Sequence, residues 1–497
     1  MTIKNKIKSS AVIISLCVGF ICQIQNNSFA DTAPFVTSTA INFDTSNVSI
    51  EPFINSSLSA PPELEYSGNL FQLRHDYPST LPIQKEYPWK KVTNYGPVTQ
   101  SNALAYVESL KQYVSDDMRK LLFNYSQWDW ANEPWWQSIW LGTERDPIHG
   151  VYVGSGFPAG TLAGQKLNLT TYVFTLYDEV AAATLNNIWG TTREQAYNPN
   201  LTNPGAQFAE GSVIIKFAFV TSCGKDWKPM KNAAIWPIYF PLNESNGSGN
   251  DPNSRCPNNG SNGTNTTPVV TNVYLMQFDI IVKDTQAAPE TGWVFSTLVY
   301  DKDAPGKDAW DRMVPLGATW GNNPEIINIS NSALTAPVTI NKNLTQNWIN
   351  TKVPEYALST LGWDGRLSGP NDGAVVDPAW AGSHYYPKGL ASVGCLGCHS
   401  SAQYQFKSFL LPTTTNPGNP IAAPGASTQE ALVLYTPGSV GWMKWFQNRP
   451  GTQPMDPGKG QIGLDYDMVT AFKAIPLWQA AVKAQNKNKK NDLIQSK

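Results

Sequence analysis

The sequence predicts an α+β protein whose larger, N-terminal part is a β-rich, sandwich-like domain with packed helices. Between residues 150 and 300, several segments alternate apolar and polar residues with the period of a strand. One long amphipathic pattern with a helical period precedes them. Aromatic residues are abundant, including 18 Trp among 497 residues, which suits a core built on large ring contacts.

The first 30 residues have the plan of a secretory signal peptide. Lys4, Lys6 and Lys8 precede an apolar run at 11–22, and a polar stretch ends at Ala30. The apolar run is short for a membrane anchor, so we expect cleavage after Ala30. No later stretch is long and apolar enough to span a bilayer. We therefore expect a periplasmic or secreted protein with no stable membrane span after cleavage.

Lipid attachment at Cys22 is an alternative fate for this leader. The residues before Cys22 are Gly, Phe and Ile, which are bulkier than such a site normally accepts. Signal-peptide cleavage is therefore the favoured interpretation.

Residues 31–84 are rich in Ser, Thr, Asn and Pro, and we expect an irregular arm there. A helix is predicted over 101–123, with Ser101 as its cap. Its apolar stripe consists of Leu104, Val107, Leu110, Val114, Met118 and Leu121. Five tryptophans follow closely, namely Trp128, Trp130, Trp135, Trp136 and Trp140. They indicate either core or a binding surface, and core is favoured because large aromatic side chains usually lie inside.

Strands are predicted over 171–177, 213–219, 274–282 and 293–300, with a weaker one over 234–240 because of Pro237. A surface loop rich in Asn, Gly and Ser is expected over 243–267. These elements define a β-rich domain of unknown function over residues 85–350, and its boundary with the following part falls near 350–370.

The most specific motif is Cys395-Leu396-Gly397-Cys398-His399, the Cys-x-x-Cys-His pattern of covalent c-type haem attachment. On a helical turn, residues three apart share a face, so both sulfurs can reach one porphyrin. The histidine that follows can serve as an axial ligand of the iron. A zinc knuckle would need a second Cys or His pair nearby, and a thioredoxin-like redox pair would need a βαβ context. Haem attachment is the favoured interpretation.

The segment Gly394–Ser400 resembles the haem site of the cytochrome c superfamily. The resemblance implies a small, mostly α domain over residues 360–486 with one covalent haem c per chain. It also implies His399 below the iron and a methionine above it, from a loop ahead of a C-terminal helix. Met455 lies in such a loop, and a helical run is expected from about Asp465. Met443, Met468 and His384 are the alternative sixth ligands.

Two further cysteines, Cys223 and Cys256, are left once the leader and the haem motif are set aside. In an oxidising compartment this pair predicts one disulfide, which would stabilise the fold by on the order of 3 kcal/mol. Two independent thiols are the alternative.

The net charge is −2, and it becomes −5 when residues 1–30, with three Lys and no acid, are removed. An acidic balance argues against nucleic acid as a partner. The basic end at 487–497 is expected to be a disordered, solvated tail.

These observations predict an exported monohaem c-type cytochrome that transfers electrons to or from a redox protein or a small molecule. The alternative is a periplasmic oxidoreductase whose β-rich domain carries the active site and uses the haem as a relay. Glu144, Arg145 and His149 would then lie together in a pocket near the haem, although such a cluster is more often a structural ion pair. A haem-based sensor would need an open sixth position.

Overall fold

The computed structural model describes residues 51–56, 58–83, 86–139, 145–157, 159–202, 204–241, 253–256, 267–327, 340–371, 392–404, 440–456, 461–475, 478–479 and 482–483. The predicted signal peptide and the basic tail lie outside this part of the chain, as do Trp140, Glu144 and His384. The predicted loop at 243–267 lies mostly outside it.

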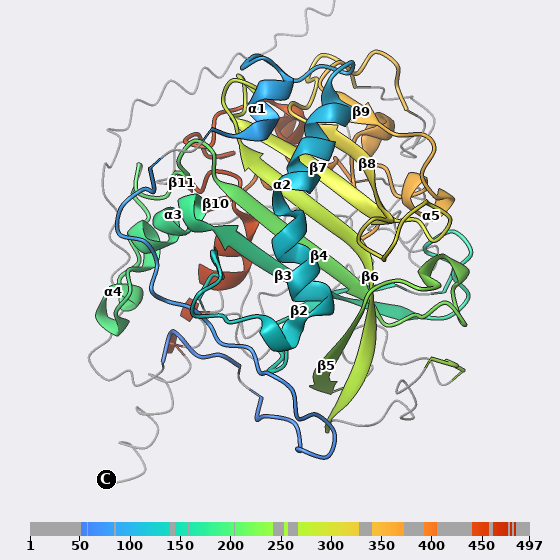
Figure 1. Cartoon of the computed structure of the whole chain (residues 1–497). Helices are drawn as coiled ribbons and strands as arrows, with labels where there is room; N and C mark the ends of the chain where they lie inside the picture. The colour runs from blue at the N-terminus through green and yellow to red at the C-terminus, as the bar shows by residue number, and fades with distance from the viewer. Residues whose placement is uncertain are drawn as a thin grey trace, which may run out of the picture. The chain divides into compact units, whose positions relative to one another are not determined.

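A nine-stranded antiparallel sheet organises the described chain (Figure 1). Its main order is β1-β3-β4-β6-β7-β8-β9, with β2 beside β3 and β5 beside β6. The strands are β1 (Trp135–Trp136), β2 (Tyr152–Phe157), β3 (Leu169–Asp178), β4 (Val213–Val220), β5 (Ile235–Pro241), β6 (Pro268–Lys283), β7 (Trp293–Tyr300), β8 (Met313–Thr319) and β9 (Asn347–Ile349). A separate short ladder pairs β10 (Gln403–Tyr404) with β11 (Ile462–Gly463).

This architecture confirms the predicted β-rich α+β class. All five predicted strands exist, as β3, β4, β5, β6 and β7. The described strands form one large sheet, however, and the second large sheet of a sandwich is not found among them. Helices, irregular chain and the C-terminal segments cover the two faces instead.

Helix α2 (Ala103–Phe123) is the long amphipathic helix that the sequence predicts. It begins two residues later than expected, with Asn102 rather than Ser101 at the N-cap. Five of the six predicted stripe residues are buried, but Leu104 is exposed, and Tyr106 takes a buried position instead. The predicted stripe is therefore correct except in the first turn of the helix, where Tyr106 packs in the core and Leu104 faces solvent.

The other helices are short, except α3. They are α1 (Pro88–Val92), α3 (Glu179–Trp189), α4 (Arg193–Tyr197), α5 (Glu355–Leu358), α6 (Cys395–His399) and α7 (Val440–Met443). A π-helical segment spans Val469–Ala474. Asp178, the last residue of β3, caps α3 by accepting the amide N–H of Ala181 at 2.9 Å.

The two faces of the sheet bury two different hydrophobic clusters. On β4, Val213, Ile215 and Phe217 face the first cluster, together with α2 and the buried tryptophans Trp128, Trp130 and Trp135. The neighbouring residue Ile214 faces the second cluster. This alternation follows from the period of two along a strand. In Figure 1, α2 crosses the front of the sheet, and the red C-terminal segments lie behind it.

The second cluster joins the two parts that the sequence assigns to separate domains. It contains Ile214 and Trp293 from the sheet together with Leu396, Leu464 and Trp478 from the C-terminal part. Residues 362–371, where turn signals suggested a boundary, are all buried. The described parts of 85–350 and 360–486 therefore share a core, and the proposed division into domains stays a prediction.

The part of the arm at 51–83 that the structure describes has neither helix nor strand, as predicted. No helix among the described residues is long and apolar enough to cross a membrane.

Candidate functional site

The Cys-x-x-Cys-His motif forms the short helix α6, which lies against the second face of the sheet. Its first turn is fixed by Gly394, whose φ of +94° is unfavourable for any residue with a side chain. The amide N–H of Cys395 donates to the carbonyl of Leu367 at 2.8 Å, which ties the helix to the preceding buried segment. The local backbone therefore presents the motif in one orientation.

The two sulfurs differ in their access to solvent. Cys395 is half-buried, whereas Cys398 is 7% exposed, and neither is part of a disulfide. Both thiols lie on the same side of α6 as the spacing predicts, because they line one pocket together.

His399 is oriented by a backbone carbonyl. Its Nδ1 lies 2.8 Å from the carbonyl oxygen of Tyr466, and because a carbonyl can only accept, Nδ1 carries the proton. The other ring nitrogen, Nε2, is then the one with a lone pair for a metal. The ring also packs on Phe295 of β7, with 4.7 Å between ring centroids. A fixed tautomer of this kind is what a metal-ligating histidine requires.

Tyr466 is held in place by the two carboxylates beside it. Asp465, which is fully buried, accepts hydrogen bonds from Lys283 Nζ at 2.7 Å and from Trp293 Nε1 at 2.8 Å. Asp467 accepts from the Tyr177 hydroxyl at 3.0 Å, and burial raises the pKa of Asp467. The sheet thus anchors both sides of the residue that orients His399.

This anchoring corrects the predicted start of the C-terminal helix. Asp465 and Tyr466 have φ of +45° and +68°, in the left-handed region, so a helix cannot begin there. The helical segment starts at Val469 instead. The strained turn is maintained by the contacts of the two carboxylates with the sheet.

A pocket opens between the motif and the sheet. Its volume is about 40 Å³. The motif contributes Cys395, Cys398 and His399, and the sheet contributes Lys216, Asp279, Phe295 and Thr297. A pocket of this volume holds a few water-sized groups and is smaller than a typical small-molecule site.

The sheet wall of this pocket is polar, and the polar residues stand in register. Lys216 on β4 lies directly opposite Asp279 on β6, which lies opposite Thr297 on β7. The Lys216 Nζ is 3.6 Å from the Asp279 carboxylate, and Thr297 donates its hydroxyl hydrogen to the same carboxylate at 2.7 Å. Gln277 donates to it as well, at 2.8 and 3.0 Å. We call Lys216, Asp279, Thr297 and Gln277 the polar row.

Sequence reasoning missed the polar row and Asp465. The signal for the row was the interruption of apolar runs, by Lys216 in β4 and by Gln277 and Asp279 in the second half of β6. Burying a charged side chain in the middle of a strand costs free energy, so such a residue indicates that a partner or a specific role compensates for the cost. Asp465 gave no such signal, because it was placed in a helix.

The predicted sixth ligands are found in different surroundings. Met455 is 3% exposed, but it is not among the described residues that line the pocket. The Met468 sulfur lies 3.9 Å from the hydroxyl of Ser401, two residues after the motif. Met443 is half-buried near the end of α7, and His384 lies outside the described residues. The assignment of Met455 therefore stays a prediction.

Arg145 and His149 do not form a pocket with the motif. His149 lies between the rings of Tyr125 and Trp236, each 4.2 Å away, and Trp236 packs on Phe217 and Phe219 of the first face. The motif lies on the second face, so the sheet separates the two. Glu144 lies outside the described residues.

The surroundings of His149 and Arg145 are those of a structural core. Burial lowers the pKa of His149 to about 3 and that of Arg145 to about 10. Asp146 accepts four backbone N–H groups, and burial raises its pKa to about 6. The Asp146 carboxylate therefore stabilises the turn that follows it in the sequence, and it also holds β5 in place by accepting the N–H of Tyr239.

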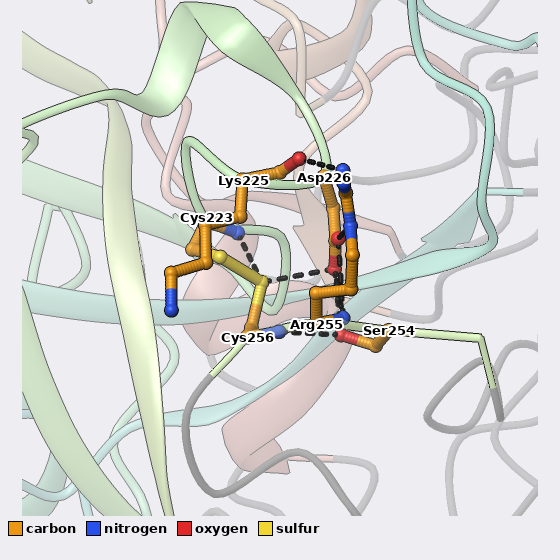
Figure 2. Close-up of a disulfide and its surroundings, with 6 residues drawn as sticks. All are labelled: Cys223, Lys225, Asp226, Ser254, Arg255 and Cys256. Carbon is orange, nitrogen blue, oxygen red and sulfur yellow. Dashed lines mark hydrogen bonds and ion pairs between the residues drawn. A yellow bond between two sulfur atoms is a disulfide. The ribbon is translucent and has the colours of Figure 1, made fainter.

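Cys223 and Cys256 form the predicted disulfide, with 2.14 Å between the sulfurs and a separation of 33 positions in the sequence (Figure 2). The Asp226 carboxylate lies beside it and pairs with Arg255 at 3.1 Å. The two sulfurs and this carboxylate lie within 4.8 Å of one another, as metal ligands can. Because the sulfurs are bonded to each other, neither is the thiolate that a metal would need.

The residues present fit a covalently bound haem. Cys395 and Cys398, which are outside any disulfide, line a pocket with His399, whose Nδ1 is hydrogen-bonded to a carbonyl, so Nε2 is the ring nitrogen that carries the lone pair. No family model, curated protein or solved structure matches the chain significantly.

Proposed function

We propose that the chain is an exported monohaem c-type cytochrome that transfers electrons between redox partners. One haem c per chain is attached through thioethers to Cys395 and Cys398, with His399 as the proximal ligand and Met455 as the sixth. Residues 360–486 are the haem-bearing part and resemble the cytochrome c superfamily at the motif. When bound, the haem supplies a one-electron couple between ferrous and ferric iron.

The observation that carries the proposal is the hydrogen bond from His399 Nδ1 to the Tyr466 carbonyl. It fixes the tautomer that a ligating imidazole needs, and two thiols lie in the same pocket. The Cys223–Cys256 disulfide supports an oxidising compartment, where c-type haem is attached.

The rival proposal, an oxidoreductase with its active site around Arg145 and His149, has less support. Both side chains are buried, and His149 packs on Trp236 while Arg145 lies over the Phe71 ring, both of which belong to the first cluster. Their hydrogen bonds are made to backbone carbonyls of neighbouring segments, including those of Ser138 and Pro237.

The test is to express the full chain with its leader in a host that carries the c-type haem maturation machinery. We expect haem that stays with the polypeptide in denaturing gels and a haemochrome spectrum typical of two thioethers. Cys395→Ser/Cys398→Ser should lose covalent haem, and wild-type protein without it would refute the proposal.

The sixth ligand needs its own comparison. Met455→Ala should abolish the weak near-infrared Met–iron charge-transfer band of the ferric protein. Met443→Ala and Met468→Ala are the matched controls and should retain it. A band that persists in Met455→Ala would reject this residue and leave covalent attachment unaffected.

A further inference from the structure

The polar row occupies a position where the fold alone would favour apolar residues. On the same face of β4, the neighbours of Lys216 at two-residue spacing are Ile214 and Ala218, both buried. The side chains of Lys216 and Asp279 are only 16% and 9% exposed. A buried ion pair is commonly no more stable than well-packed apolar residues of the same size, so stability does not account for it.

The row is also organised around one carboxylate. Asp279 receives hydrogen bonds from Thr297 and Gln277, and the Gln277 side-chain oxygen in turn accepts the N–H of Asn371 at 2.8 Å. The carboxylate is therefore held in one position while Lys216 lies 3.6 Å away. Such preorganisation is what a fixed electrostatic field requires.

The row faces the motif across the pocket. Lys216, Asp279 and Thr297 line it from the sheet, opposite the cysteines and His399. A group bound at the motif would share this pocket with the two charges, and because their side chains are largely buried, solvent screens them less than it screens surface charges.

We propose that Lys216 and Asp279 form a charge pair that sets the reduction potential of the haem bound at Cys395, Cys398 and His399. This inference rests on the proposed function. Reduction adds one electron to the iron centre, so the Lys216 ammonium favours the ferrous state and the Asp279 carboxylate favours the ferric state. Thr297 and Gln277 are positioning residues, since they act through Asp279.

The charge pair predicts shifts of opposite sign. Lys216→Met should lower the midpoint potential, Asp279→Asn should raise it, and the double variant should return close to wild type. Lys216→Arg keeps the charge and should stay near the wild-type potential. The measurement is a spectroelectrochemical titration of the full-length haem protein at fixed pH and ionic strength.

Lys120→Met is the matched control. Lys120 pairs with Glu133 and lies on α2, over the first face of the sheet. The Lys120→Met variant removes the same charge on the other face of the sheet. Its haem midpoint potential should therefore differ from the wild-type value much less than that of Lys216→Met does. A purely structural role for the row would give potentials that do not depend on the sign of the removed charge.

The possible failures are distinguishable. If wild type carries no covalent haem, the proposed function fails. If haem is present but the Lys216 and Asp279 variants shift the potential in the same direction, or no more than Lys120→Met, the inference fails and the cytochrome proposal stands. If Lys216→Met does not fold, the near-isosteric Asp279→Asn and the charge-conserving Lys216→Arg decide the question. The midpoint potential should then rise for Asp279→Asn and stay near the wild-type value for Lys216→Arg.

Discussion

Lys283 on β6 reaches the carboxylate of Asp465 at 2.7 Å, although 182 residues separate the two in the sequence. The pair joins the sheet to the turn whose next carbonyl orients His399. The sheet therefore supports the candidate site from both sides, through this anchor and through the polar row.

The anchor predicts a large loss of stability on Asp465→Asn. The variant leaves the Lys283 ammonium, 12% exposed, without its carboxylate. Removing one partner of a buried pair costs about 3–5 kcal/mol, which urea unfolding would detect. The exposed pair Lys91–Glu86 is the control, and Glu86→Gln should leave the unfolding midpoint nearly unchanged. Equal effects of the two variants would contradict the role assigned to Asp465.

Gly394 predicts a specific glycine requirement at the start of the motif helix. Gly394→Ala should destabilise the protein by about 1–3 kcal/mol, because its φ of +94° strains a residue with a side chain. The added Cβ would also lie 3.0 Å from the carbonyl oxygen of Leu367.

Gly160 offers a matched comparison for Gly394. Its φ is +88°, but no atom would lie within 4 Å of a Cβ added there. Gly160→Ala should therefore show the backbone strain alone, and thermal unfolding should place it between wild type and Gly394→Ala. A smaller effect at Gly394 than at Gly160 would contradict the crowding around the Leu367 carbonyl.

The disulfide predicts a measurable contribution to stability. Cys223→Ser/Cys256→Ser should lower the free energy of unfolding by about 3 kcal/mol. Without the disulfide the loop between the two residues is no longer closed in the unfolded chain, so the unfolded state gains conformational entropy. Reductant should lower the unfolding midpoint of wild type but not that of the double variant. Alkylation of Cys223 or Cys256 in the native, non-reduced protein would show that the pair is not bonded.

His149 predicts a pH-dependent loss of stability in acid. Burial lowers the pKa of His149 to about 3 from an ordinary value near 6.5, so the unfolded chain binds this proton first. The contribution to stability is present above about pH 6.5 and declines as pH falls toward 3, by up to about 1.4 kcal/mol per pH unit.

The variant His149→Phe removes this titration and retains a ring between Tyr125 and Trp236. The difference in unfolding free energy between variant and wild type should shift in favour of the variant as pH falls from 6.5 to 4. A pH-independent difference for His149→Phe would contradict the prediction.

Local sequence patterns predicted the strands well and the site only in part. Alternation located β7 at its observed bounds, because a buried strand with a period of two needs no long-range information. It missed β8, where Pro315 and Gly317 interrupt the pattern. The motif was found because its chemistry depends on spacing along the chain. Lys216 and Asp279 were not, because their proximity depends on the pairing of β4 with β6.

The low exposure of Cys398 has a consequence for the order of assembly. A thiol that is 7% exposed in the finished fold is withheld from any enzyme that must reach it from outside. On the proposed function, this sulfur would have to be joined to the haem before α6 packs on the sheet. The pair Lys283–Asp465, which holds the turn beside Tyr466 on the sheet, spans a long sequence distance, and such contacts are entropically slow to close. Attachment would then precede the closure of this part of the fold.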